Sequence, residues 1–120
     1  MVSEIDSKVL NTPSLKILAI ETSTEVCSIG LSVYGQVMVA ENEANQNHSE
    51  HVLPMIDELL KVNELSLSDI DVIGFGAGPG SFTGVRLACS VAQGLAFGVN
   101  TPVVPVSSLE ALAQKTGKDK

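Results

Sequence analysis

Residues 76–81 (GAGPGS) form a glycine-rich stretch whose residue types suit the binding of an anion. Its glycines at alternate positions give the backbone access to positive φ angles that other residues avoid. The β-branched and aromatic residues 71–75 before it predict a buried strand, and residues 82–97 after it predict a helix that Ser81 or Thr83 caps. A loop between a strand and a helix N-terminus presents free N–H groups to a phosphate or a carboxylate.

This glycine stretch matches none of the common catalytic or cofactor-binding motifs. No Gly-Lys-Ser or Gly-Lys-Thr closes it as in a Walker A loop, and its glycines lack the spacing of a dinucleotide fingerprint. Ser81 does not lie in a G-x-S-x-G elbow, so helix capping is favoured over nucleophilic attack as the role of its hydroxyl. We therefore predict no catalytic residue in this chain.

A second polar group, Glu21-Thr22-Ser23-Thr24, follows the apolar residues 16–21, which predict a central buried strand. The Glu21 carboxylate and the hydroxyls after it suit a hydrated magnesium ion beside phosphates. The same carboxylate would equally well accept hydrogen bonds from nearby N–H groups, and both interpretations stay open at this point. The candidate nucleotide or anion loop comprises Glu21, Thr22, Ser23, Gly78, Gly80, Ser81 and Thr83.

His48 and His51 have a spacing that would place both on one face of a helix. Zinc and iron sites usually need a spacing of one full turn and at least one further ligand. The chain has only these 2 histidines, so we predict a surface pair at a helix start and no metal site. Arg86 is predicted to pair with an acidic residue of the same domain, with a phosphate or a partner's carboxylate as the alternative.

The composition restricts the class of protein. The chain has 120 residues, enough for one domain, and its net charge of −7 argues against direct binding of RNA or DNA. The core must be aliphatic, because 44% of the residues are hydrophobic and only 3% aromatic. We expect no membrane-spanning segment, because the apolar runs are too short and too glycine-rich to span a bilayer, and we expect no secretory signal. Cys27 and Cys89, without CxxC spacing, are expected to be buried free thiols of a cytoplasmic protein.

The N-terminal half of the sequence predicts a mobile extension followed by a meander of antiparallel β-strands. Residues 1–15 show no hydrophobic period and predict a mobile extension, and residues 16–120 predict a single lobe. Residues 25–34 and 37–43 alternate between apolar and polar positions, with a tight turn predicted at Gly35-Gln36. With the first strand they predict three antiparallel strands joined by short connections.

Two further βα units complete the predicted lobe. Apolar spacing through Val62 predicts a helix capped by Asn47 or Ser49, with Pro54 in its first turn or kinking it. Residues 101–106 (TPVVPV) predict an edge-tolerant strand because they contain two prolines, and residues 109–115 predict a last helix. The order β-β-β-α-β-α-β-α predicts an α/β lobe with a mixed sheet, the layout of the ribonuclease H and actin-like (ASKHA) fold.

The helix predicted over residues 82–97 lacks the polar stripe of an ordinary surface helix. Between Val85 and Val99 its only charge is Arg86, and small residues recur at positions 84, 88, 92 and 96. We expect one face to pack on the sheet and a second face to pack on another polypeptide, because small residues let a second backbone approach closely.

Three motifs in this order resemble the TsaB proteins, also called YeaZ: ILAIETSTEVCSIGL, HSEHVLPMIDELL and GFGAGPGSFTGVRLACSVAQGLAFG. The resemblance covers residues 15–115. It implies an ASKHA fold and a place in the bacterial machinery that makes N6-threonylcarbamoyladenosine at position 37 of tRNAs that decode ANN codons. In that family the transfer is credited to the paralogue TsaD. TsaB resembles a non-catalytic scaffold that works with TsaD and the ATPase TsaE, so contact with tRNA is implied only through the complex.

The resemblance also bears on the candidate sites. The catalytic paralogue carries an H-x-x-x-H metal motif where this chain reads His48-Ser49-Glu50-His51, so no metal centre is implied. Glu21-Thr22-Ser23-Thr24 replaces the usual Asp-x-Gly phosphate loop, so no tightly bound cofactor is expected, and ATP or ADP with magnesium at a subunit interface stays open. The family's pairing surface, carried over to this sequence, comprises Leu53, Ile56, Leu60, Val85, Arg86, Ala88, Cys89, Ala92 and Leu95.

Three hypotheses follow, and the first is favoured. The chain is a scaffold lobe that binds a TsaD-type subunit through its helices, or a nucleotide-binding lobe of an actin-like ATPase or kinase, or a homodimer without another partner. Family members usually have a second lobe of similar fold, and this chain ends after the first. An exposed inter-lobe surface would favour a homodimer of the isolated chain.

Overall fold

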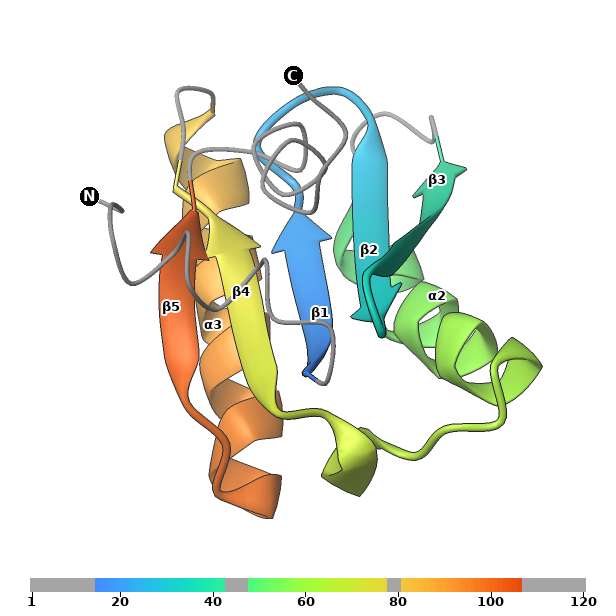
Figure 1. Ribbon diagram of the computed structural model, residues 1–120. Helices are drawn as coiled ribbons and strands as arrows, with labels where there is room; N and C mark the ends of the chain where they lie inside the picture. The colour runs from blue at the N-terminus through green and yellow to red at the C-terminus, as the bar shows by residue number, and fades with distance from the viewer. Residues whose placement is uncertain (1–14, 43–47, 78–80, 107–120) are drawn as a thin grey trace.

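The computed structural model describes residues 15–42, 48–77 and 81–106 (Figure 1). The strands are β1 (Lys16–Glu21), β2 (Cys27–Val33), β3 (Gln36–Asn42), β4 (Val72–Gly76) and β5 (Val103–Val106), and the helices are α2 (His48–Val62), the short 3-10 turn η1 (Leu67–Asp69) and α3 (Phe82–Val99). The extension predicted before residue 15, the helix predicted over residues 109–115, and Gly78 and Gly80 lie outside the described residues.

The sheet confirms the predicted α/β lobe with mixed pairing. Its strand order is β3-β2-β1-β4-β5. β2 runs antiparallel to both β1 and β3, which is the predicted meander. β4 runs parallel to β1. β5 runs parallel to β4, because α3 carries the chain back along the sheet between these two strands. The proline-containing β5 is an edge strand, as its sequence predicts.

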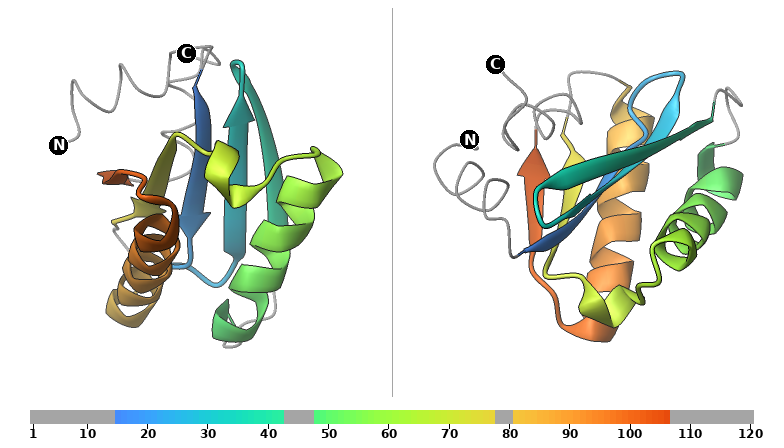
Figure 2. Two further views of the ribbon diagram at one scale, coloured as in Figure 1. Left: turned by 90° about the horizontal axis from the view of Figure 1, so that it is seen from below. Right: turned by 45° about the vertical axis from the view of Figure 1, so that its right-hand side comes forward.

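Both long helices cover the same face of the sheet (Figure 2). The main core contains alternate residues of β1 and β2 together with the inward faces of the two helices: Leu18, Ile20, Cys27, Ile29, Leu31, Val52, Ile56, Leu60, Ala88, Ala92 and Ala96 among others. The other face carries a smaller cluster of Ile17, Ala19, Val72 and Val106, against which Leu15 packs. Leu15 therefore belongs to the lobe rather than to the predicted extension.

The β2–β3 turn lies one residue earlier than predicted, at Tyr34 and Gly35 instead of Gly35 and Gln36. Both turn residues have positive φ angles, 52° at Tyr34 and 84° at Gly35. A two-residue hairpin turn of this kind matches the right-handed twist of its strands, so Gln36 becomes the first residue of β3.

Helix α2 starts at His48, directly after Asn47, a predicted cap that lies outside the described residues. Ser49, the other predicted cap, lies inside the helix and does not cap it. Pro54 therefore occupies the helix interior rather than the first turn. The ring removes one backbone hydrogen bond, and the helix continues because its apolar face is buried against the sheet.

The two thiols have different environments. Cys27 is buried, as predicted, whereas Cys89 is only partly buried on α3, so that part of the prediction is wrong. Burial raises the pKa of the Cys27 thiol, and the thiolate is the reactive form.

We expect a thiol reagent at mildly alkaline pH to label Cys89 in the native protein and to reach Cys27 only after denaturation. Equal labelling rates of the two thiols in the native protein would contradict this assignment.

Helix α3 is longer and more apolar than the sequence-based expectation, in which every apolar run is too short to span a bilayer. It has 18 residues with a mean hydropathy of 1.3, so by length and composition alone it could cross a membrane, and the prediction that every run is too short is wrong for it. Its small inward residues Gly84, Ala88, Ala92 and Ala96 are buried, and the three alanines belong to the core of the lobe. The other 14 of its 18 residues are exposed or partly exposed, so much of its apolar surface faces outward.

Candidate functional site

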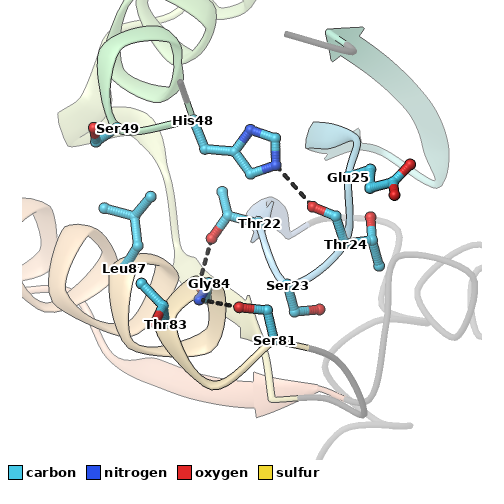
Figure 3. Close-up of a pocket in the computed structure, with 10 residues that line it drawn as sticks. All are labelled: Thr22, Ser23, Thr24, Glu25, His48, Ser49, Ser81, Thr83, Gly84 and Leu87. Atoms are coloured by element: carbon cyan, nitrogen blue, oxygen red, sulfur yellow. Dashed lines mark hydrogen bonds between the residues drawn. The ribbon is translucent and has the colours of Figure 1, made fainter. Parts of the chain in front are cut away.

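A pocket of about 640 Å³ lies between the N-terminal ends of α2 and α3 and the loop that follows β1 (Figure 3). Its lining residues are Thr22, Ser23, Thr24, Glu25, His48, Ser49, Ser81, Thr83, Gly84 and Leu87. The two polar motifs singled out in the sequence therefore meet at one place in the fold. Glu21 is absent from this lining, so its carboxylate does not belong to the same pocket.

The first turn of α3 is joined to the loop after β1 by hydrogen bonds. Ser81 caps the helix as predicted, since its Oγ accepts from the Gly84 N–H at 3.1 Å. The Ser81 N–H donates to the Ser23 carbonyl at 2.7 Å. The buried Thr22 Oγ1 donates to the Gly84 carbonyl at 2.6 Å. Thr83 lies inside the helix and is exposed, so it is not the cap.

Glycine is required at position 84 because the two backbones touch there. A Cβ on Gly84 would overlap the Thr22 carbonyl oxygen and lie 2.7 Å from the Ser23 Cα. Neither neighbour is the free end of a side chain, so neither can give way without moving the loop. The contact explains why the apolar helix begins with a small residue on its inner face.

Glu21 lies just outside this pocket at the end of β1 and is 7% exposed. Its Oε2 accepts from the Ser23 N–H at 3.1 Å and from the Ser23 hydroxyl. Of the two interpretations left open by the sequence, these contacts support the hydrogen-bonded carboxylate over the magnesium ligand. Oε1 has no hydrogen-bond partner among the described residues and lies against Gly76, where a Cβ would overlap it.

The two histidines do not form the predicted surface pair. His48 is 8% exposed, and its Nε2 lies 2.7 Å from the Thr24 carbonyl oxygen. A carbonyl only accepts, so Nε2 carries the proton of this bond. One turn later on the buried face stands Val52, whereas His51 is partly exposed. His48 thus ties α2 to the loop after β1, and the described residues contain no group of three or more His, Cys, Asp or Glu arranged for a metal ion.

The charges around the pocket do not favour a polyphosphate. Among the described residues, its lining contains Glu25 and no lysine or arginine. Arg86 is exposed, and its Cζ lies 5.5 Å from the centre of the Phe82 ring. The intradomain ion pair predicted for Arg86 is not found within the described ranges, where Lys61 pairs with Asp57 at 3.1 Å. The described part of the pocket therefore offers hydroxyls and helix N-termini together with one carboxylate.

A second hollow, an apolar groove of about 390 Å³, separates α2 from the C-terminal half of α3. It is lined by Leu53, Ile56, Asp57, Leu60, Lys61, Leu65, Ser66, Leu67 and Leu95. Leu53, Ile56, Leu60 and Leu95 were predicted as partner-facing residues. Leu65 and Leu67 were missed, because the segment after α2 reads as a connecting loop, and their alternate apolar positions were the only available signal.

The predicted partner surface needs a correction at four positions. Ala88 and Ala92 are 0% exposed and face the sheet, and Ile56 and Leu60, at 3% and 6%, form the floor of the groove. None of the four is an outward-facing contact residue, because the sheet covers Ala88 and Ala92, and Ile56 and Leu60 are accessible only as lining of the groove. The other predicted residues, Leu53, Val85, Arg86, Cys89 and Leu95, are exposed or partly exposed.

Comparisons with known proteins agree with this fold and these motifs. A family model described as "TsaD: tRNA N6-adenosine threonylcarbamoyltransferase" matches residues 36–120. The "tRNA threonylcarbamoyladenosine biosynthesis protein TsaB" of Haemophilus influenzae is 48% identical over 101 residues, covering 84% of this chain and 43% of the relative. The protein of the same name from Escherichia coli is 43% identical over 100 residues, covering 83% of this chain and 43% of the relative.

A solved structure gives the same result. "YeaZ from Pseudomonas aeruginosa" superposes with a TM-score of 0.76 at 44% identity, covering 84% of this chain and 47% of that one. The fold is thus a lobe of the ASKHA type. The chain belongs to the family that the TsaD model describes, and its relatives named above are TsaB (YeaZ) proteins, which confirms the resemblance found in the sequence. It spans less than half the length of these relatives.

Proposed function

We propose that this chain acts in tRNA N6-threonylcarbamoyladenosine biosynthesis as a non-catalytic scaffold lobe that binds and activates a TsaD-type transferase. In this proposal tRNA is reached only through the complex, a TsaE-type ATPase works with the same assembly, and the location is the cytoplasm. The names of the relatives support the pathway. We propose in addition that the lobe holds no nucleotide tightly by itself, since the only side chain among the described lining residues that bears a full charge at neutral pH is the carboxylate of Glu25.

The observation that carries the proposal is the apolar groove between α2 and α3 together with the exposed apolar residues of these two helices. Leu53 at its wall is 51% exposed, and Phe97 on α3 is 90% exposed. Neighbouring Gly94 and Gly98 would meet nothing within 4 Å if they carried a Cβ, so packing inside the lobe does not require them. Glycines on an exposed helix face allow a partner helix to approach closely, and exposed apolar side chains mark interaction sites.

The partner surface is tested by placing a charge in the groove wall. We expect Leu53→Glu to fold normally and to weaken binding of a purified TsaD-type transferase by about thirtyfold or more. The change removes an apolar contact worth about 2 kcal/mol and leaves an unpaired carboxylate in the interface, which adds to the loss. Light scattering on a sizing column and titration calorimetry measure the complex. The matched control is Val39→Glu, since Val39 is also 51% exposed but lies on β3 away from the groove.

The mixing experiment also separates the alternatives. A mixed peak at the summed mass that disappears with Leu53→Glu and persists with Val39→Glu supports the scaffold. A peak at twice the mass of the chain that ignores the transferase and responds to Leu53→Glu would show that the groove pairs two copies of this chain. No complex between the unaltered chain and the transferase would overturn the proposed function of this lobe.

A further inference from the structure

The loop after β1 holds both helices at once. Thr22 and Ser23 bond to the first turn of α3, through the Thr22 hydroxyl to the Gly84 carbonyl and through the Ser23 carbonyl to Ser81 N–H. The next residue, Thr24, accepts at its carbonyl from His48, the first residue of α2. Figure 3 marks the bond between Thr22 and Gly84 and the bond between His48 and Thr24, which lie close together. We call residues 22–24 the bracket.

The inner face of α3 offers little that would hold the helix in position along its axis. Its buried residues Gly84, Ala88, Ala92 and Ala96 have no side chain long enough to interlock with the sheet, and the larger Val91 and Leu95 pack against the core while only partly buried. Small residues pack closely but give little resistance to sliding or rolling of a helix. Directional hydrogen bonds therefore help to fix the axial position of α3. At its other end Thr101 N–H donates to the Ala96 carbonyl, which ends the helix without tying it to α2.

The bracket and the apolar groove share the same two helices. Leu53 and Leu60 of α2 and Leu95 of α3 all line the groove. The width of the groove depends on how the helices lie relative to each other, and the bracket is the polar connection that links their N-terminal ends. Thr22 and His48 are both more than nine-tenths buried, at 1% and 8% exposure, so their bonds are shielded from competing water.

We propose that Thr22 and His48 are positioning residues that set the relative placement of α2 and α3, and through it the shape of the groove that receives the partner. This inference rests on the proposed function only for the identity of the partner. It gives a structural role to the Thr22 hydroxyl and the His48 ring, two groups of the kind that often act in catalytic or binding sites.

The test compares loss of each donor with its conservative replacement. Thr22→Val removes the hydroxyl and keeps the branched shape, whereas Thr22→Ser keeps the donor. His48→Leu removes the ring donor, whereas His48→Gln places an amide N–H at a similar reach. Spin labels on cysteines at the exposed positions Glu58 and Gln93, in a Cys89→Ser background, report the distance between α2 and α3 in the chain alone.

We expect a shifted or broadened distance distribution in Thr22→Val and His48→Leu, and the unaltered distribution in Thr22→Ser and His48→Gln. Affinity for the transferase should fall about tenfold in the first pair and recover in the second, since each lost hydrogen bond is worth about one decade at most. Thermal melts check that all four variants fold. Where a variant melts at a lower temperature than the unaltered chain, its distances and affinity are measured well below its melting temperature.

The distance measurement keeps the two proposals apart. If the unaltered chain binds no transferase but the distances respond as expected, the bracket stands and the proposed function fails. If the distances in Thr22→Val and His48→Leu match those of the unaltered chain, the bracket is overturned even where the transferase binds.

Discussion

Gly84→Ala is expected to destabilise the lobe by about 3 kcal/mol or more, the sum of an overpacked contact and at least one lost buried hydrogen bond. The new Cβ would overlap the Thr22 carbonyl and crowd the Ser23 Cα. Relief requires α3 to move away from the bracket. That movement stretches the bond between Thr22 Oγ1 and the Gly84 carbonyl and the bond between Ser81 N–H and the Ser23 carbonyl.

The control for Gly84→Ala is the same substitution on the outer face of the same helix. Gly94 would gain a Cβ with nothing within 4 Å, so Gly94→Ala should stabilise the lobe by up to about 1 kcal/mol through helix propensity alone. Urea unfolding followed by circular dichroism gives both values. Equal midpoints for the two variants would show that the close approach at Gly84 does not exist.

The local elements could be predicted from short-range patterns. The alternation of Cys27, Ile29 and Leu31 defined a strand with one buried face, and the structure places all three in the core. The Ser81 cap could likewise be read from its position before an apolar helix. These features depend on residues a few positions apart, so the sequence carries them directly.

The faces of the helices could not be assigned in the same way. Helix α3 is apolar almost all round, and its pattern does not say whether the small residues or the larger ones meet the sheet. The sheet takes Ala88 and Ala92, and the partly exposed Val85 and Leu95 are left toward other contacts. The choice depends on the volume available above β1 and β4, which only the tertiary structure defines.

The candidate site shows the same limit over a longer range. Thr22 and Gly84 are 62 residues apart, and His48 and Thr24 are 24 apart. Neither pairing has a sequence signature, so the hydroxyls looked like a phosphate loop and His48 looked like a surface residue. In the fold these groups bond to backbone carbonyls. Every residue has a backbone carbonyl, so the side-chain types in the sequence do not indicate which carbonyl accepts the hydrogen bond.

The second large effect is expected at the end of β4. Gly76→Ala should destabilise the lobe by about 2 kcal/mol, because its Cβ would overlap Glu21 Oε1 and displace a buried carboxylate from the Ser23 N–H and hydroxyl. Gly74→Ala in the same strand is the matched control. Its Cβ would make ordinary contacts of 3.5 Å to the Val104 carbonyl and 3.8 Å to Val106, so it should be tolerated.

A double-mutant cycle isolates the contact between Gly76 and Glu21. Glu21→Ala destabilises the lobe by itself, since it leaves the Ser23 N–H without its acceptor. It also empties the space that the Cβ of Gly76→Ala needs, so adding Gly76→Ala to Glu21→Ala should cost close to nothing. The expected coupling energy is therefore about 2 kcal/mol in favour of the double variant. Additive effects in urea unfolding would mean that the Glu21 carboxylate does not lie against Gly76 in solution.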